Sequence, residues 1–195
     1  MKKIYICAAL GLFFASCSTE ESATTHTEDM KTVNVVTKVN WVEAMNDIEK
    51  ACESNTSYAN TADLIEKVRK IAYSNAKFNA IAGSNYVEPT ADELIYVMST
   101  NALTTIQSMN YSIVAKTYLE DLLVNQETWT VDPTKDSGLS FAEIDLLTTL
   151  HDIVDPDDEW NKKKPIAIAY GYQQSLAKAV MMSVLAQEFK KIDVN

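Results

Sequence analysis

The chain has 195 residues, of which 27 are acidic and 17 are Lys or Arg, so its formal net charge is −10. Such an acidic chain is repelled by the phosphates of nucleic acids, and no basic stripe runs along it, which excludes nucleic acid as a partner. Hydrophobic residues make up 47% of the sequence, as in a folded domain, whereas 4 Gly and 4 Pro are too few for the many turns of a β-sandwich or barrel. The composition therefore predicts an all-α domain.

The first sixteen residues have the pattern of a removable export signal. Lys2 and Lys3 form a short positive region, and residues 4–15 form an uncharged apolar run that is too short to cross a bilayer of ~30 Å as a helix. The run ends at Ala15-Ser16-Cys17, and an ordinary cleaved leader would instead have a small residue where Phe14 stands. The pattern predicts that the mature chain begins at the cysteine.

This segment resembles the signal peptide of bacterial lipoproteins, in which two small residues precede a cysteine. The resemblance implies that the thiol of Cys17 carries a lipid with two acyl chains and that a dedicated peptidase cleaves before this residue. Two acyl chains hold a protein stably on a membrane, since each buried methylene contributes ~0.8 kcal/mol. Glu20 and Glu21, which follow Ser18 closely, are similar to the acidic export tag of Bacteroidota lipoproteins. The resemblance therefore implies an outer-membrane lipoprotein that faces the periplasm or the cell surface.

The sequence divides into three segments. We expect a signal peptide over residues 1–16, the acylated cysteine and a flexible tether over residues 17–38, and an all-helical domain over residues 39–195. The tether is rich in Ser, Thr and Glu and poor in large apolar residues. Cys52 is the one cysteine that remains in the domain, so the domain has no internal disulfide and must rely on its core. We interpret Cys52 as a buried structural thiol, because it lies on an apolar helix face.

Apolar residues recur at helical spacing from Asn40 onward, which predicts a bundle of five or six helices. Two helices begin at capping boxes, in which a Ser or Thr side chain accepts a backbone N–H and a Glu three residues later reaches back. The last helix is expected to run without a break to Ile192, and its apolar residues on several faces predict a place at the centre of the bundle. The expected helices begin near Asn40, Thr61, Thr90, Ser112, Ser140 and Pro165.

One face of each predicted helix carries the expected core. Gly83 is the expected stop of the second helix. The predicted inward residues are Trp41, Met45, Ile48 and Cys52, then Leu64, Val68, Ile71, Phe78 and Ile81, then Leu94, Met98, Ala102, Ile106 and Met109, then Val114, Tyr118 and Leu122, then Ile144, Leu147, Leu150 and Val154, and finally Leu176, Val180, Val184 and Leu185.

The loop over residues 132–143 resembles the twelve-residue calcium loop of the EF-hand family. The resemblance implies a calcium site, because calcium takes six to eight oxygen ligands. Ser137 stands where that family has glycine, and Pro133 disfavours a helical backbone just before it. The alternative is a loop that only caps the following helix. The residues on the ligand positions are Asp132, Thr134, Asp136, Ser140 and Glu143.

Other patterns point less directly to chemistry. The acidic run from Asp155 to Glu159 suits a helix N-terminus, or alternatively a metal. His151 lies beside an apolar face, one turn before Asp155, and no second histidine shares its helix. The sequence has no Gly-x-Ser-x-Gly motif, phosphate-binding glycine loop or dinucleotide fingerprint, so it identifies no catalytic, cofactor or metal residue. The aromatic residues that suit either a ligand site or the edge of the core are Trp129, Trp160, Tyr170 and Tyr172.

These patterns favour a non-enzymatic binding or interaction module that its lipid holds at a membrane, with an unknown protein or small molecule as partner. The first alternative is a calcium-binding domain that uses the 132–143 loop. The second is an envelope enzyme whose catalytic residues come together only in the folded chain.

Overall fold

The computed structural model describes residues 41–55, 57–84, 86–125, 132–154 and 163–192. The chain divides into two compact units, Met1–Asn34 and Val35–Asn195, and every described residue belongs to the second. The expected signal peptide, the tether, Cys17 and the acidic run 155–159 lie outside the described residues.

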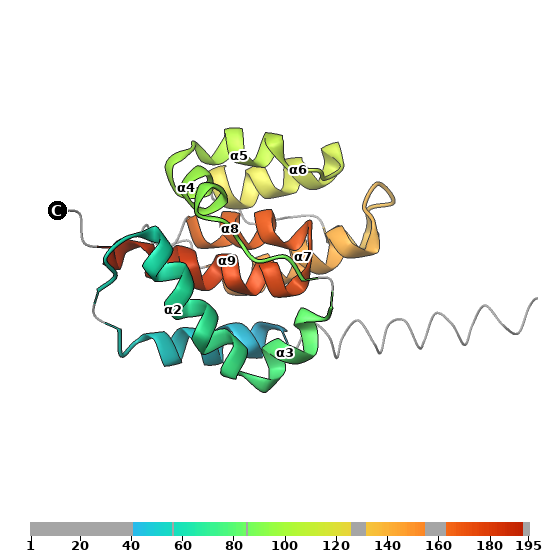
Figure 1. Ribbon diagram of the computed structural model, residues 1–195. Helices are drawn as coiled ribbons and strands as arrows, with labels where there is room; N and C mark the ends of the chain where they lie inside the picture. The colour runs from blue at the N-terminus through green and yellow to red at the C-terminus, as the bar shows by residue number, and fades with distance from the viewer. Residues whose placement is uncertain (1–40, 56, 85, 126–131, 155–162, 193–195) are drawn as a thin grey trace, which may run out of the picture. The chain divides into compact units, whose positions relative to one another are not determined.

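The described residues form nine α-helices and no β-strand, which confirms the all-α class (Figure 1). An isolated bridge pairs Tyr58 with Ile192. No helix within the described ranges is long and apolar enough to cross a membrane. The helices are residues 41–52, α2 (Thr61–Ser74), α3 (Ala76–Ala82), α4 (Ala91–Ser99), α5 (Ala102–Ser108), α6 (Ile113–Glu120), α7 (Phe141–Ile153), α8 (Lys163–Tyr172) and α9 (Leu176–Glu188). A π-helical turn (Asp121–Asn125) and two 3-10 turns (Pro133–Lys135 and Phe189–Lys191) complete them.

The expected number of five or six helices is wrong, because polar caps divide three of the predicted helices. The Asn75 side chain accepts the Phe78 N–H and so separates α2 from α3. The Asn101 side chain accepts the N–H groups that begin α5, and the Ser175 side chain does the same for α9. Each cap satisfies donors that a continuous helix would bond internally, and so allows the chain to turn there.

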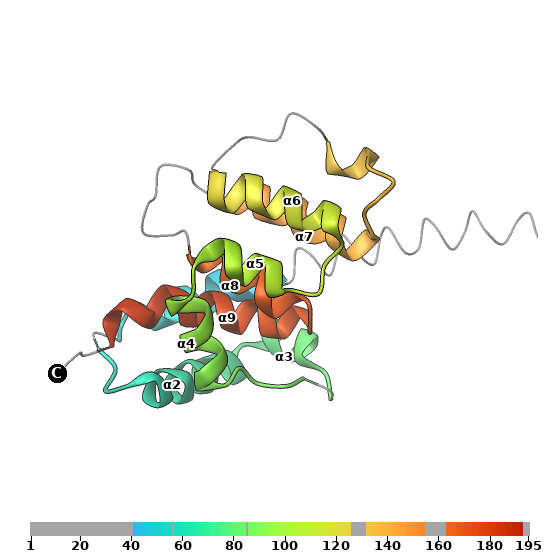
Figure 2. The same cartoon turned by 90° about the horizontal axis from the view of Figure 1, so that it is seen from above.

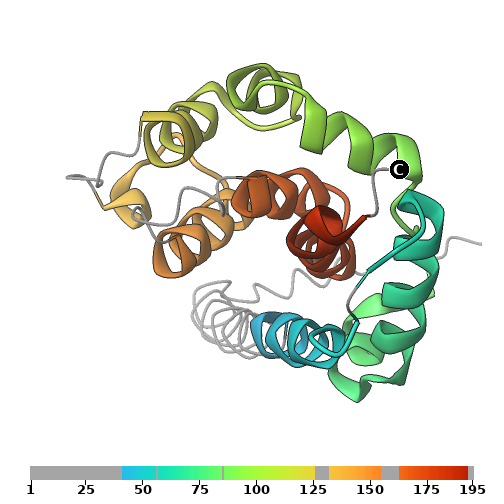
Figure 3. The same ribbon diagram turned by 90° about the vertical axis from the view of Figure 1, so that its left-hand side faces the viewer.

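The helices α8 and α9 lie at the centre of the described bundle, and the other helices surround them (Figure 3). Both are buried on nearly all sides, as the sequence predicts for this region. They approach so closely at Gly171 that a Cβ atom placed there would lie 2.5 Å from the Lys178 carbonyl oxygen. The glycine is therefore required by this close contact between backbones.

Most of the predicted core faces are confirmed. Trp41, Ile48 and Cys52 are fully buried. The face of α6 is wrong by one position, since Ala115 and Leu119 are its buried residues and Val114 and Tyr118 are half-buried. The rotation of α6 is fixed at its first turn, where the backbone of its cap residue Ser112 bonds to α7. The helices α6 and α7 contact each other, and in Figure 2 α7 lies partly behind α6.

Candidate functional site

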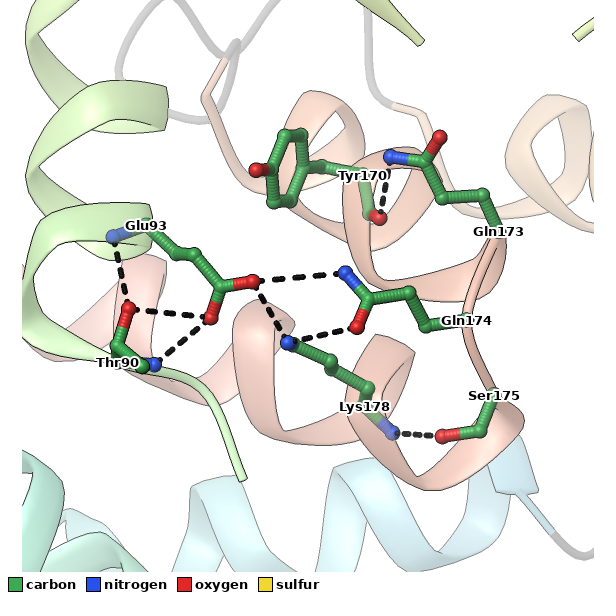
Figure 4. Close-up of polar contacts among 7 residues, drawn as sticks. All are labelled: Thr90, Glu93, Tyr170, Gln173, Gln174, Ser175 and Lys178. Carbon is green, nitrogen blue, oxygen red and sulfur yellow. Dashed lines mark hydrogen bonds and ion pairs between the residues drawn. The ribbon is translucent and has the colours of Figure 1, made fainter. Parts of the chain in front are cut away.

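The most buried charged side chain among the described residues is that of Lys178, in the first turn of the central helix α9. Only 1% of the Lys178 surface is exposed to solvent. The Ser175 side chain caps α9 by accepting the Lys178 backbone N–H at 3.1 Å, so this cap also fixes where the lysine side chain begins (Figure 4). An ammonium group in this position must have partners, because an unpaired buried charge is strongly unfavourable.

Glu93 supplies the counter-charge from α4. Its Oε1 atom lies 2.7 Å from the Lys178 Nζ atom. Its Oε2 atom accepts the Thr90 backbone N–H at 2.8 Å, and the Thr90 hydroxyl accepts the Glu93 N–H at 3.2 Å. The predicted capping box is therefore confirmed, and the glutamate that closes it also forms an ion pair across the bundle.

Gln174 completes what we call the Lys178 cluster, which consists of Thr90, Glu93, Gln174 and Lys178. The side-chain oxygen of Gln174, Oε1, accepts from the Lys178 ammonium at 2.9 Å, and the side-chain nitrogen, Nε2, donates to Glu93 Oε1 at 3.4 Å. The residue lies in the turn between α8 and α9, so the cluster ties α4 to this turn (Figure 4).

Two opposing influences set the pKa of Glu93. Burial raises it, but the ammonium of Lys178 and the N–H of Thr90 lower it more, so the pKa lies below its usual range. Glu93 is therefore ionised at neutral pH. The buried Lys178 Nζ atom is held between a carboxylate and an amide oxygen, so it is not within reach of a substrate in solution.

A second ion pair joins the first described helix to the centre. Lys164 Nζ lies 2.7 Å from Glu49 Oε1. Ser183, a buried residue of α9, donates to the same carboxylate oxygen at 3.2 Å and lies 3.0 Å from the sulfur of Met45. These contacts attach the helix over residues 41–52 to both α8 and α9.

A more deeply buried carboxylate, Glu188, lies at the end of α9. The Tyr58 hydroxyl donates to its Oε2 atom at 2.6 Å, and Lys191 Nζ lies 2.9 Å from the same atom. Burial and this bond raise the pKa of Tyr58. Cys52 lies nearby as a free, buried thiol, and burial together with the charge of Glu188 raises its pKa to about 12. The thiol is therefore protonated at neutral pH, in agreement with the structural role predicted for it.

The loop over residues 132–143 uses its polar groups for local hydrogen bonds. Asp132 accepts the Thr134 N–H at 2.9 Å, and Asp136 accepts the Gly138 N–H at 2.8 Å. Within the part of the chain that the structure describes, no group of three or more His, Cys, Asp and Glu side chains could hold a metal ion.

Two roles were expected for Glu143: to bind calcium with both oxygens, or to cap a helix. The structure shows that Glu143 has the capping role. Its Oε2 atom accepts the Ser140 N–H at 2.8 Å, and its Oε1 atom accepts the Ser112 N–H at 2.6 Å. Burial raises its pKa, but the two N–H bonds outweigh this and hold the pKa below its usual range. Both oxygens of this carboxylate are thus engaged in bonds at the starts of two helices.

The remaining candidates do not form one site. His151 is about half exposed, with Nδ1 3.9 Å from Asp152 Oδ1, and Asp155 lies outside the described residues. Tyr172 donates to Asp145 at 2.7 Å, and Tyr170 packs against Tyr96. Both tyrosines thus lie at the edges of the core; Trp129 and Trp160 are outside the described ranges.

Sequence reasoning missed the Lys178 cluster. The sequence did carry one signal: Lys178 is a single charged residue between Ala177 and Ala179, in a helix that is apolar on all sides. A charge in such a place must be paired with another group. Its partner lies 85 residues away and could not be identified from the sequence.

No protein-family model matches the chain, and no curated protein or solved structure matches it either.

Proposed function

We propose that this protein is an exported lipoprotein, anchored to the outer membrane by acyl chains on Cys17, whose helical domain is a non-enzymatic binding or interaction module. The observation that carries the proposal is the segment from Lys2 to Cys17, a positive start, an apolar run and a small-small-Cys ending. In this proposal Cys17 is the cysteine that takes part in chemistry, and the thiol of Cys52 in the domain is buried and free.

The described polar groups support a module that does not carry out catalysis. The buried ions Lys178, Glu143 and Glu188 are each held by partners from other segments of the chain: Glu93 of α4, the Ser112 cap of α6, and Tyr58 between residues 41–52 and α2. Such groups stabilise a bundle, whereas a general base or nucleophile needs a free proton site within reach of a substrate.

The anchor is tested by comparing two cysteine substitutions in the expressing bacterium. We expect Cys17→Ser to move the protein from the membrane fraction to the soluble fraction, because it removes the acyl acceptor. Cys7→Ala is the matched control, since it removes a cysteine of the same leader and should leave the protein in the membrane fraction.

Mass spectrometry of the purified wild-type protein supplies the direct measurement. We expect an N-terminus at Cys17 whose mass is increased by acyl chains. An unmodified N-terminus, or Cys17→Ser protein that still sediments with membranes, would overturn the proposed anchor.

A further inference from the structure

Two large apolar side chains project into solvent where α6 and α7 begin. Ile113 is 85% exposed and Phe141 is 73% exposed, more than any other large hydrophobic residue that the structure describes. Each is the first residue of its helix. Such side chains are more often covered by a partner when several of them gather in one place.

The starts of α6 and α7, which carry these two residues, are joined by one carboxylate. The N–H groups of Ser112 and Ser140, the residues directly before them, bond to the two oxygens of Glu143. A second contact supports this placement, because a Cβ atom on Gly138 would lie 3.0 Å from a methyl group of Val114. The two exposed side chains of Ile113 and Phe141, which we call the apolar tip, therefore stand on helix starts that are joined to each other.

We infer that the apolar tip inserts into the interface of the zwitterionic phospholipid layer to which the protein is anchored. The inference rests on the proposed lipid anchor. As a flexible chain, the 24 residues from Cys17 to Asn40 would have a root-mean-square span of about 27 Å, so the domain stays within reach of the bilayer. At this effective concentration, a contact too weak to recruit a free protein is sufficient to orient a tethered one.

Charge selects the kind of lipid. Removal of the signal peptide takes away Lys2 and Lys3 and leaves 15 basic residues against 27 acidic ones, so an anionic surface would repel the domain. In the 3-10 turn that contacts α7, the Lys135 side chain is 81% exposed and paired with Asp132 at 3.4 Å. Groups of both signs suit a headgroup that carries both a phosphate and an ammonium.

The test places a tryptophan reporter at the tip of the acylated protein, bound to phosphatidylcholine vesicles with brominated acyl chains. We expect Phe141→Trp to add fluorescence that the bromines quench by at least half. Ile95→Trp is the matched control, because Ile95 is 44% exposed on α4, which packs on α2, α8 and α9. The bromines should quench less than a tenth of the fluorescence that this tryptophan adds. Ile113→Ser in the Phe141→Trp background should reduce the quenching at position 141.

Flotation of the same vesicles separates the two proposals. Protein that floats without preferential quenching at position 141 overturns the inserted tip and leaves the anchor intact, whereas acylated protein that does not float overturns both. Hydrogen exchange of the unaltered protein is a second readout: amides of residues 113–116 and 141–144 should exchange more slowly on vesicles than in soluble Cys17→Ser protein. Slowing in outer membranes but not on pure lipid would assign the tip to a protein partner and overturn the inference.

Discussion

The two capping boxes have the same sequence pattern but different tertiary partners. In both, Oε2 of the glutamate accepts the N–H of the cap residue at 2.8 Å. The Oε1 atom of Glu93 then binds a buried ammonium, that of Lys178, whereas the Oε1 atom of Glu143 binds a backbone N–H, that of Ser112. The local motif therefore determines where a helix begins, and the remote partner determines what the glutamate contributes to the fold.

This difference has energetic consequences. Loss of the Glu93 charge leaves a buried cation without its counter-ion, which destabilises proteins strongly. Loss of the Glu143 charge leaves neutral donors without a good acceptor, which is a smaller penalty. The comparison can be tested with substitutions that change the charge of each glutamate and keep its shape.

The largest effect is expected for Glu93→Gln. We expect the free energy of unfolding to fall by about 3–5 kcal/mol, because Lys178 would stay buried without a carboxylate. Urea denaturation measures the change. Glu66→Gln is the control, because this glutamate pairs with Lys70 on the surface of α2 and should change stability by less than about 1 kcal/mol.

Glu143→Gln should destabilise the domain by about 2 kcal/mol. A glutamine can accept one N–H through its oxygen, but its amide group would face the other N–H of Ser112 or Ser140. Hydrogen exchange should show faster exchange of one of these two amides. If Glu143→Gln were as destabilising as Glu93→Gln, the proposed difference between the boxes would be wrong.

Lys178→Met should destabilise the domain by only about 1 kcal/mol. Methionine fills a similar volume, and the Glu93 side chain, which is 22% exposed, keeps water and the Thr90 N–H as partners. In a double-mutant cycle, Glu93→Gln with Lys178→Met should be more stable than Glu93→Gln alone. Additive losses would show that the two residues do not interact as described.

Acid should weaken both boxes in the same direction. The pKa values of Glu93 and Glu143 are below the ordinary value of 4.5, so the folded state binds protons less readily than the unfolded state. Their contribution to stability is therefore fully present above about pH 4.5 and is lost as pH falls through the lowered folded-state pKa values. Urea midpoints between pH 7 and pH 3 should fall less steeply in Glu93→Gln than in the wild type.

The smallest expected effect is that of calcium on thermal unfolding. Because both oxygens of Glu143 already accept N–H groups, we expect millimolar calcium and a chelator to give the same melting temperature within about 1 °C. A rise with calcium that Asp132→Asn abolishes would instead support the EF-hand resemblance.

Local patterns predicted the helix starts well. Both capping boxes, the Ser112 cap and the positive φ of 56° at the Gly83 stop follow from side chains or backbone within one helical turn. The buried face of residues 41–52 also follows, because its apolar spacing leaves one choice of face.

The breaks and the ion pairs could not be predicted in the same way. Apolar residues continue at helical spacing across Asn75 and Asn101, so periodicity alone joins segments that these caps divide. The packing of α8 on α9 depends on a backbone contact at Gly171, which a side-chain pattern does not record. The partners of Lys178 depend on how distant segments meet in space.

The position of α9 has a consequence for the order of folding. This innermost helix comes after every helix that packs on it, and its contacts reach back 138 residues to Met45 and 130 residues to Tyr58. Until residues 176–188 have emerged, the earlier helices lack the surface that covers their apolar faces. The core therefore cannot be completed before α9 has been synthesised, and contacts so distant in sequence form slowly. Delayed folding of this kind would suit the proposed export, because an exported chain that crosses a membrane channel does so before its core forms.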